Sequence, residues 1–294
     1  MINVLLILNL LFFGTTVTYC QHLKENGSEN ERDIKLVFAQ NSFHDAKPED
    51  VLATARVLVN HIKKLKNLKN NFIVELVSDD KEILAKHKSD FDLIVLSTEQ
   101  YLRLKKTLPV EPFSVNYSDG VAGFIYHLIV SKNDNINNLA QLKGETIYIQ
   151  ANTKDQAASL WLNKLLKDES LKSKDVHFGS IIFDGKATNV LLPVFFNKAK
   201  ACIVTNSSLK LILDLNPGIK NKIKTLYTSE PIILGIACLN SNEKDEVGYK
   251  VLKEILPTLH ENEYGKQFLN LYKTEKLLPF KEEYLNGYFN LVKQ

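Results

Sequence analysis

The feature that most constrains the fold is a regular alternation between short apolar runs and helix-like segments after residue 33. Residues 34–39, 72–77 and 91–96 are apolar runs of strand length. A helix pattern that begins at Pro48 and a shorter one over residues 79–87 separate these runs, and a third helix start follows the last run. Helices between short buried strands are typical of a parallel sheet with helices on its faces. The first third of the chain therefore predicts three strand–helix pairs.

The same alternation begins again near residue 120. The strands expected from apolar runs cover residues 121–131, 146–149, 176–183, 201–205, 223–227 and 232–239. After the last of these runs, three helices are expected over residues 243–256, 262–272 and 281–291. Two cycles of this kind predict an α/β protein of two lobes, each a mostly parallel sheet flanked by helices.

A length of 294 residues is ample for two lobes with separate cores. We expect lobe 1 to comprise residues 33–119 and 230–294 and lobe 2 to comprise residues 120–229. If the run over residues 232–239 returns to lobe 1, the chain passes twice between the lobes. Two such passages predict a two-segment hinge beside a cleft.

The N-terminus has the pattern of a secretory signal. An apolar run over residues 4–13 is too short to span a bilayer, and a polar, charged segment follows it. We expect a signal peptide over residues 1–20, a flexible linker over residues 21–32 and a periplasmic protein. The alternatives are a buried first element and a lipid attached at Cys20, although Tyr19 stands where a lipoprotein signal needs a small residue.

Charge, cysteine content and the lack of catalytic motifs argue against several classes of protein. Lys and Arg number 37 against 34 Asp and Glu, a net charge of +3, and the basic residues are scattered, which argues against a nucleic-acid partner. Three cysteines cannot form a disulfide framework. Cys202 and Cys238 lie in apolar runs, where buried thiols are expected, and a disulfide between them stays open. The histidines and cysteines lack zinc-site spacings, and neither a Gly-x-Ser-x-Gly nor a phosphate-loop motif occurs. The sequence therefore predicts no enzyme, no metal and no cofactor.

Polar, uncharged side chains follow several predicted strands where each strand ends. Asn41, Ser97 with Thr98, Asn152 with Thr153, and Asn206 stand at these places. Ligands of open α/β sheets bind at the carboxyl ends of the strands, where free backbone N–H groups of helix starts favour anions. The pattern predicts a cleft for a small anion or polar molecule. The alternative is that these residues are only helix caps, a role that Ser, Thr and Asn also favour.

Over residues 34–256 the chain resembles the type 2 periplasmic binding proteins of the phosphate, phosphite and phosphonate kind. The most specific match is residues 138–147, which have the form N-L-x-x-L-K-G-x-T-I. Further matches are the strand over residues 91–96, the helix-to-strand segment over residues 194–204, and the segments over residues 215–217 and 226–231.

This resemblance implies a monomeric receptor that closes two lobes on a small oxyanion and delivers it to an ABC permease. The alternative partner is a membrane sensor, for which the chain would be a ligand-sensing module. Phosphonate binders of this family carry Ser-Thr-Ser-Gly after a strand of lobe 2, and of these hydroxyl residues this chain has only Thr153 at the matching place. The acidic residues with which such proteins hold an ammonium group have no match here. The resemblance therefore does not imply an aminophosphonate ligand. Phe43 takes the place of a first-lobe aromatic, and Lys186 would favour an anion. The expected ligand-binding residues are Asn41, Phe43, Ser97, Thr98, Asn152, Thr153, Lys186 and Asn206.

Overall fold

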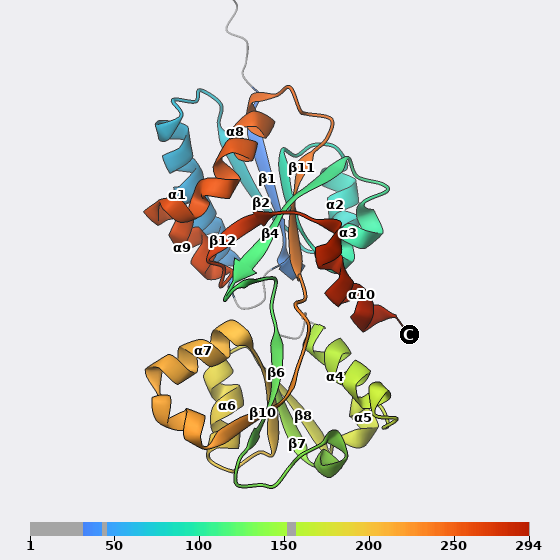
Figure 1. Cartoon of the computed structure of the whole chain (residues 1–294). Coiled ribbons are helices and arrows are strands. Elements are labelled where there is room, and N and C mark those ends of the chain that lie inside the picture. The colour runs from blue at the N-terminus through green and yellow to red at the C-terminus, as the bar shows by residue number, and fades with distance from the viewer. Residues whose placement is uncertain (1–31, 43–45, 152–156, 294) are drawn as a thin grey trace, which may run out of the picture. The chain divides into compact units, whose positions relative to one another are not determined.

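The structure is a computed structural model that describes residues 32–42, 46–151 and 157–293. The expected signal peptide and residues 21–31 of the expected linker lie outside the described residues. Residues 32–294 form one unit of the chain, and its described part contains two β-sheets flanked by helices (Figure 1). None of the described helices is long and apolar enough to cross a membrane.

The first sheet has seven strands in the order β12-β4-β11-β3-β1-β2, with β5 paired to β4. Its strands are β1 (Ile34–Ala39), β2 (Phe72–Val77), β3 (Leu93–Ser97), β4 (Val110–Ser118), β5 (Val121–Ala122), β11 (Gly235–Asn240) and β12 (Lys276–Pro279). The helical segments around it are η1 (Gln40–Ser42), α1 (Pro48–Leu65), α2 (Asp80–Lys86), α3 (Thr98–Leu104), α8 (Val247–Ile255), η4 (Leu256–Glu261), α9 (Glu263–Leu271) and η5 (Glu282–Leu285).

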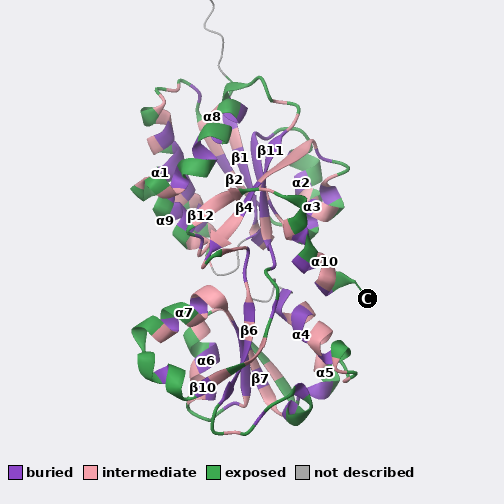
Figure 2. Ribbon diagram, in the orientation of Figure 1, coloured by how far each residue is buried: buried purple, intermediate pink, exposed green. Residues whose placement is uncertain are grey.

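Alternate residues of the first sheet supply two separate cores. In β1, Leu36 and Phe38 pack with α1, α8 and α9, whereas Val37 and Ala39 pack with α2 and α3. Figure 1 shows these two groups of helices on opposite sides of the sheet, and Figure 2 shows the buried strands between them. The expected order of three strand–helix pairs is confirmed. The strands could be recognised in the sequence because a strand covered on both faces appears as a continuous apolar run.

The second sheet has five strands in the order β10-β6-β9-β7-β8. Its strands are β6 (Tyr126–Ser131), β7 (Thr146–Gln150), β8 (Ser180–Asp184), β9 (Ala201–Thr205) and β10 (Ile223–Thr228). The helical segments that accompany it are η2 (Leu139–Leu142), α4 (Ala157–Asp168), α5 (Lys174–His177), α6 (Ala187–Phe195), α7 (Asn206–Leu215) and η3 (Pro217–Asn221). We call each sheet with its helices a lobe, first and second in that order.

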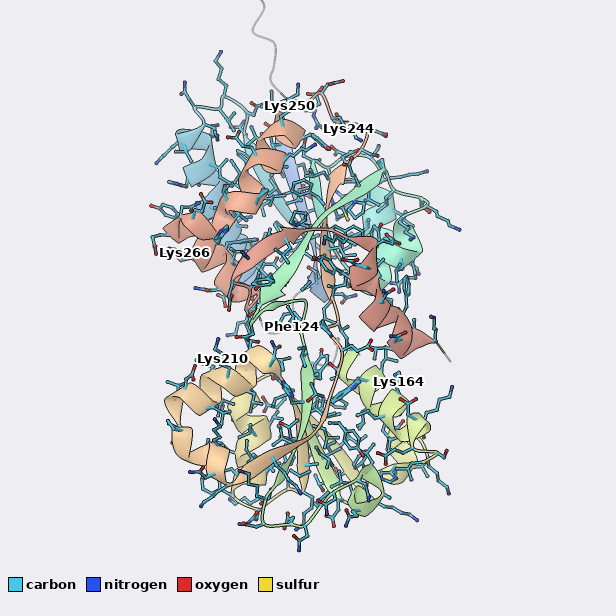
Figure 3. All side chains as sticks on the ribbon, in the orientation of Figure 1. Phe124, Lys164, Lys210, Lys244, Lys250 and Lys266 are labelled. Atoms are coloured by element: carbon cyan, nitrogen blue, oxygen red, sulfur yellow. The ribbon has the colours of Figure 1, made fainter. Side chains whose placement is uncertain are left out.

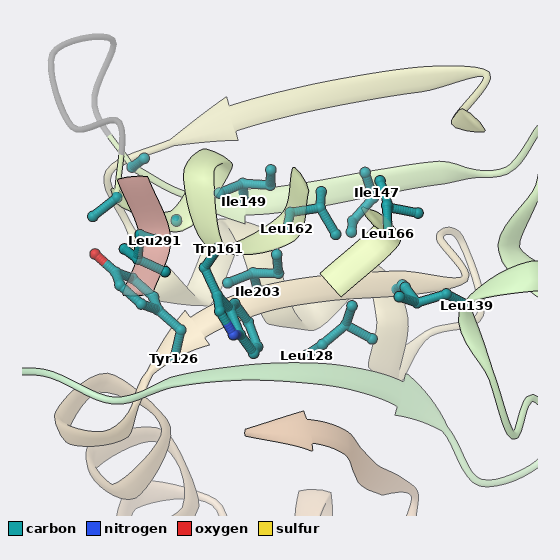
Figure 4. Packing of buried hydrophobic residues seen from close by; sticks show 14 of the residues in the cluster. Tyr126, Leu128, Leu139, Ile147, Ile149, Trp161, Leu162, Leu166, Ile203 and Leu291 are labelled. Atoms are coloured by element: carbon teal, nitrogen blue, oxygen red, sulfur yellow. The ribbon is translucent and has the colours of Figure 1, made fainter. Parts of the chain in front are cut away.

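The core between the second sheet and α4 is built around Trp161, the single tryptophan of the chain. Its ring stacks on that of Tyr126, with 6.1 Å between the ring centroids. Figure 4 shows it among the side chains of Leu128 and Ile203. On the other face of the sheet, α6 and α7 cover a second core around Ile129.

The expectation of mostly parallel sheets was wrong for part of each sheet. The strands β1, β2 and β3 are mutually parallel, as are β7, β8 and β9, but β11, β12 and β6 run antiparallel to their neighbours. The direction of these strands follows from where the chain crosses from one sheet to the other. A strand that enters a sheet from the carboxyl ends of its parallel strands has to run in the opposite direction, and both β6 and β11 enter in this way.

Two cysteines occupy the centres of different sheets. Cys202 lies in β9 and Cys238 in β11, both are fully buried, and both are free thiols. Burial raises the pKa of each thiol above its ordinary value. The question left open by the sequence is therefore answered: these two residues do not form a disulfide.

The helix α10 (Asn286–Val292) packs on the core of the second sheet, although it follows strands of the first. Tyr288 and Leu291 are buried in the same cluster as Trp161. Gly287 lies directly against the chain at Pro231, where a Cβ atom would come within 1.9 Å of the Pro231 carbonyl oxygen. The C-terminal helix therefore connects the two lobes outside the covalent passages.

Candidate functional site

The two passages between the sheets touch one another. The first crossing segment, residues 119–125, and the second, residues 229–234, form an antiparallel bridge between Phe124 and Ile232. The amide of each residue donates to the carbonyl of the other, at 2.9 and 2.8 Å. Gly123 has a φ of +89°, and a Cβ there would lie 2.4 Å from the Ile232 carbonyl oxygen, so this contact requires glycine. Figure 3 labels Phe124 on the first crossing segment.

Ser97 and Thr98, two of the expected site residues, use their polar groups within the protein. The Ser97 hydroxyl accepts from the Gln100 amide, and the Gln100 side chain accepts from the Ser97 amide, a reciprocal cap of α3. Thr98 is 1% exposed, and its hydroxyl donates to the Ile233 carbonyl at 2.7 Å. Ser97 therefore caps α3, and Thr98 fixes the start of α3 against the second crossing segment.

Asn206, a third expected residue, holds the first crossing segment. Its side-chain oxygen accepts from the backbone amide of Ile125 at 3.1 Å, and its backbone amide donates to the Ile125 carbonyl at 2.8 Å. Its side-chain nitrogen lies 3.4 Å from an oxygen of Asp119. Asp119 also binds the ammonium of Lys210 at 2.8 Å (Lys210 is labelled on α7 in Figure 3). Asn206 and Lys210 thus join the start of α7 to the hinge.

The remaining expected residues lie at separate places. Asn41 is half-buried in η1, at the end of β1 and beside β3. Lys186 is exposed after β8, where its amide donates to the carboxylate of Asp184 at 2.7 Å. That hydrogen bond, with a second from Asn189, lowers the pKa of Asp184. Phe43, Asn152 and Thr153 lie outside the described residues.

A polar cluster at the ends of β7 and β9, which we call the α7 entrance, comprises Gln150, Thr205, Ser207, Ser208 and Lys273. The sequence pattern marks Thr205 and Ser207 as polar residues at a strand end, but it missed Gln150, Ser208 and Lys273. Gln150 and Ser208 are each 3% exposed. The Gln150 side-chain oxygen accepts from the Thr205 amide at 3.1 Å, and its nitrogen donates to the Ser208 hydroxyl at 2.8 Å. The Lys273 ammonium reaches the same hydroxyl from the first lobe, at 3.4 Å.

Two signals in the sequence pointed toward this cluster. Gln150 is a polar residue at the end of an otherwise apolar strand, and Ser207 with Ser208 stands just after Asn206 at the end of β9, a neighbour of β7 in the sheet. Lys273 gave no signal, because it stands in a polar turn after α9 and reaches the cluster only through tertiary structure.

The α7 entrance is suited to an anion. Thr205 caps α7 through its hydroxyl, so the positive end of this ten-residue helix faces the cluster. The groups that line it are hydroxyls, one carboxamide and one ammonium, and most of them are donors to an anion. In the described part of the chain, His, Cys, Asp and Glu side chains do not gather in threes at a place that fits a metal ion.

A separate cavity of about 820 Å³ lies among α4, the second crossing segment and α10. Four of its lining side chains form two polar pairs. Lys164 pairs with Asp168 at 2.5 Å, and Glu230 accepts from Asn290 at 2.8 Å. Lys167 and Lys293 also line this cavity, which lies apart from the α7 entrance.

Comparisons with known proteins agree with a ligand-binding fold. The family model of the phosphonate periplasmic substrate-binding proteins of ABC transporters matches residues 42–285. A sequence search of curated proteins finds no match.

Three solved structures share the fold, at sequence identities that support the fold alone. XAC2383 from Xanthomonas citri is 14% identical with a TM-score of 0.59, covering 88% of this chain and 95% of its own. A binding protein component of a phosphonate ABC transporter from Pseudomonas aeruginosa is 13% identical with a TM-score of 0.58, covering 89% and 86%. PhnD1 from Prochlorococcus marinus, in complex with methylphosphonate, is 15% identical with a TM-score of 0.57, covering 88% and 96%.

Proposed function

Because this chain belongs to the periplasmic substrate-binding proteins of phosphonate ABC transporters, we propose that it captures a small phosphonate-like oxyanion between its two lobes. The observation that carries this proposal is the α7 entrance. There a helix start in the second lobe meets the ammonium of Lys273 from the first lobe. An anion at this place would interact with both lobes at once.

Capture would work by a shift between open and closed states. A ligand that touches both lobes binds the closed state more tightly and so stabilises it by that difference in affinity. The two crossing segments provide the pivot, since they are joined by a single bridge between Phe124 and Ile232. Asn206 and Thr98 attach α7 and α3 to this pivot, so movement of the hinge is transmitted to both helix starts.

The remaining parts of the proposal follow the sequence. Residues 1–20 would direct export and residues 21–32 would act as a linker. The moving lobes would be residues 33–119 with 230–294 and residues 120–229. The closed, monomeric protein would then deliver its ligand to an ABC permease, the partner of this family. The expected ligand-binding residues Asn41, Phe43, Asn152, Thr153 and Lys186 belong to the same proposal.

A thermal-shift screen of the purified protein tests the proposal. The panel is phosphate, phosphite, methylphosphonate, sulfate and a sulfonate, and methylphosphonate is the first choice because PhnD1 is seen with it. A ligand at a hundred times its Kd stabilises the folded state by about 2.7 kcal/mol, which for a protein of this size raises Tm by about 4–5 °C. A rise with one oxyanion would support capture. No rise with any of them would contradict it and favour the ligand-sensing alternative.

A further inference from the structure

We infer that the cavity among α4, the second crossing segment and α10 is a second ligand site, which takes a molecule with an apolar chain and a single carboxylate. This inference goes beyond oxyanion capture and does not depend on it. The cavity measures about 820 Å³, and sites for small molecules typically measure roughly 300–1,000 Å³. None of the residues that form the α7 entrance lines it.

Much of the cavity lining is apolar. Leu160, Leu165 and Leu171 are half-buried and pack against the core of the second lobe. Trp161 and Ile232, which also line the cavity, are 4% and 1% exposed. An aliphatic chain that covers this lining removes both apolar surfaces from water, which favours binding.

The charges of the lining favour a ligand with one negative charge. Three ammonium groups and two carboxylates line the cavity, those of Lys164, Lys167, Lys293, Asp168 and Glu230. One positive charge is therefore in excess, and a single carboxylate on the ligand would neutralise it.

Two of the ammonium groups are available for that carboxylate. Lys164 already pairs with Asp168 at 2.5 Å. In the part of the chain that the structure describes, Lys167 and Lys293 make neither an ion pair nor a side-chain hydrogen bond. Both side chains are exposed. The carboxylate would therefore stay partly in water at the edge of the cavity, while the chain of the ligand covers the apolar lining.

The single tryptophan of the protein reports on this site directly, because Trp161 lines the cavity. The experiment is titration of the purified protein with sodium decanoate while tryptophan fluorescence is recorded, with calorimetry as the second readout. We expect saturable binding of decanoate and roughly tenfold weaker binding of octanoate, which has two fewer CH₂ groups. Acetate, which has no chain, and decyltrimethylammonium, a cation with the same chain, should show no saturable binding at these concentrations.

A double variant tests the charged part of the site. K167M/K293M should bind decanoate about fivefold more weakly than the wild type, because two ion pairs with the carboxylate are lost. The matched control is K250M/K266M, which removes two exposed lysines of α8 and α9 that lie outside the cavity and are labelled in Figure 3. This control should bind decanoate as the wild type does.

Four results would overturn the inference. They are no saturable decanoate binding by either readout, decyltrimethylammonium binding as tight as that of decanoate, unchanged affinity in K167M/K293M, and an equal loss of affinity in both double variants. Thermal unfolding without ligand establishes that each variant is folded.

Competition with methylphosphonate shows whether the two sites are separate. Decanoate should still bind when methylphosphonate is present, because the cavity and the α7 entrance share no residue. A Kd for decanoate that rises in proportion to the methylphosphonate concentration would place decanoate in the oxyanion site and would also overturn the inference.

Discussion

The side chain of His127 links a single residue to the strand pair that leads into the hinge. It lies in β6, directly after the first crossing segment, and its ring nitrogen Nδ1 is 3.1 Å from the hydroxyl oxygen of Thr228 in β10. Burial lowers the pKa of His127 below its ordinary value, because the charged imidazolium is poorly solvated there. The free energy of unfolding therefore depends on pH through this residue.

The direction of that dependence follows from linkage. Above about pH 6.5 the ring is neutral in both the folded and the unfolded chain. As the pH falls below that value the unfolded chain takes up the proton first, so stability is lost down to the lower pKa of the folded state. We expect the wild type to lose stability more steeply than H127Q between pH 7 and pH 5. Urea unfolding of both proteins at pH 7.5, 6.5 and 5.5 measures this difference, and parallel curves would contradict it.

Among the secondary-structure elements, α10 has the most unusual placement. It belongs by sequence to the end of the first lobe, yet Tyr288 and Leu291 complete the core under α4. Asn290 also holds the Glu230 carboxylate on the second crossing segment. This helix therefore stabilises both the second-lobe core and the hinge.

The substitution Gly287→Ala tests whether this helix packs against the second crossing segment. In an exposed helix an alanine is more stable than a glycine by up to about 1 kcal/mol. At Gly287 we expect the opposite sign, a loss of about 1–3 kcal/mol, because the added Cβ would clash with the Pro231 carbonyl. The control is G218A, where a Cβ meets no atom within 4 Å. Urea denaturation measures the free energy of unfolding of both variants. An equal change in both would show that α10 does not pack tightly on Pro231.

The strand and helix order was predictable where each element is set by local pattern. The three strand–helix pairs of the first lobe follow from apolar runs that are buried on both faces. The sequence analysis missed β4 and β12. The first includes Pro112 and the polar Glu111 and Asn116, and the second has only four residues. The pairing of β4 with β11 and of β12 with β4 is set by the crossing segments and not by local sequence.

The candidate site was predictable only in part, because its side chains make contacts that depend on tertiary structure. Ser97, Thr98 and Asn206 stand at strand ends as expected, and the structure shows them bonded to the crossing segments or to a helix start. The pattern of polar residues at strand ends locates such places but does not reveal which neighbour each side chain contacts. Lys273 enters the α7 entrance from a distant part of the chain. A single sequence contains no local signal for such a contact.

At the scale of the whole molecule, the central claim is that the two lobes close on an oxyanion. The hinge, the C-terminal helix and the α7 entrance each connect the lobes at a different place. In the absence of ligand the closed and open states should exchange, and an anion that binds both lobes should shift the population toward the closed state.

Small-angle X-ray scattering of the protein with and without saturating methylphosphonate tests this claim most directly. We predict a smaller radius of gyration with methylphosphonate than without it, and no change with methylammonium, a cation of similar size. An equal radius of gyration at a methylphosphonate concentration that calorimetry shows to be saturating would contradict closure of the lobes on the anion.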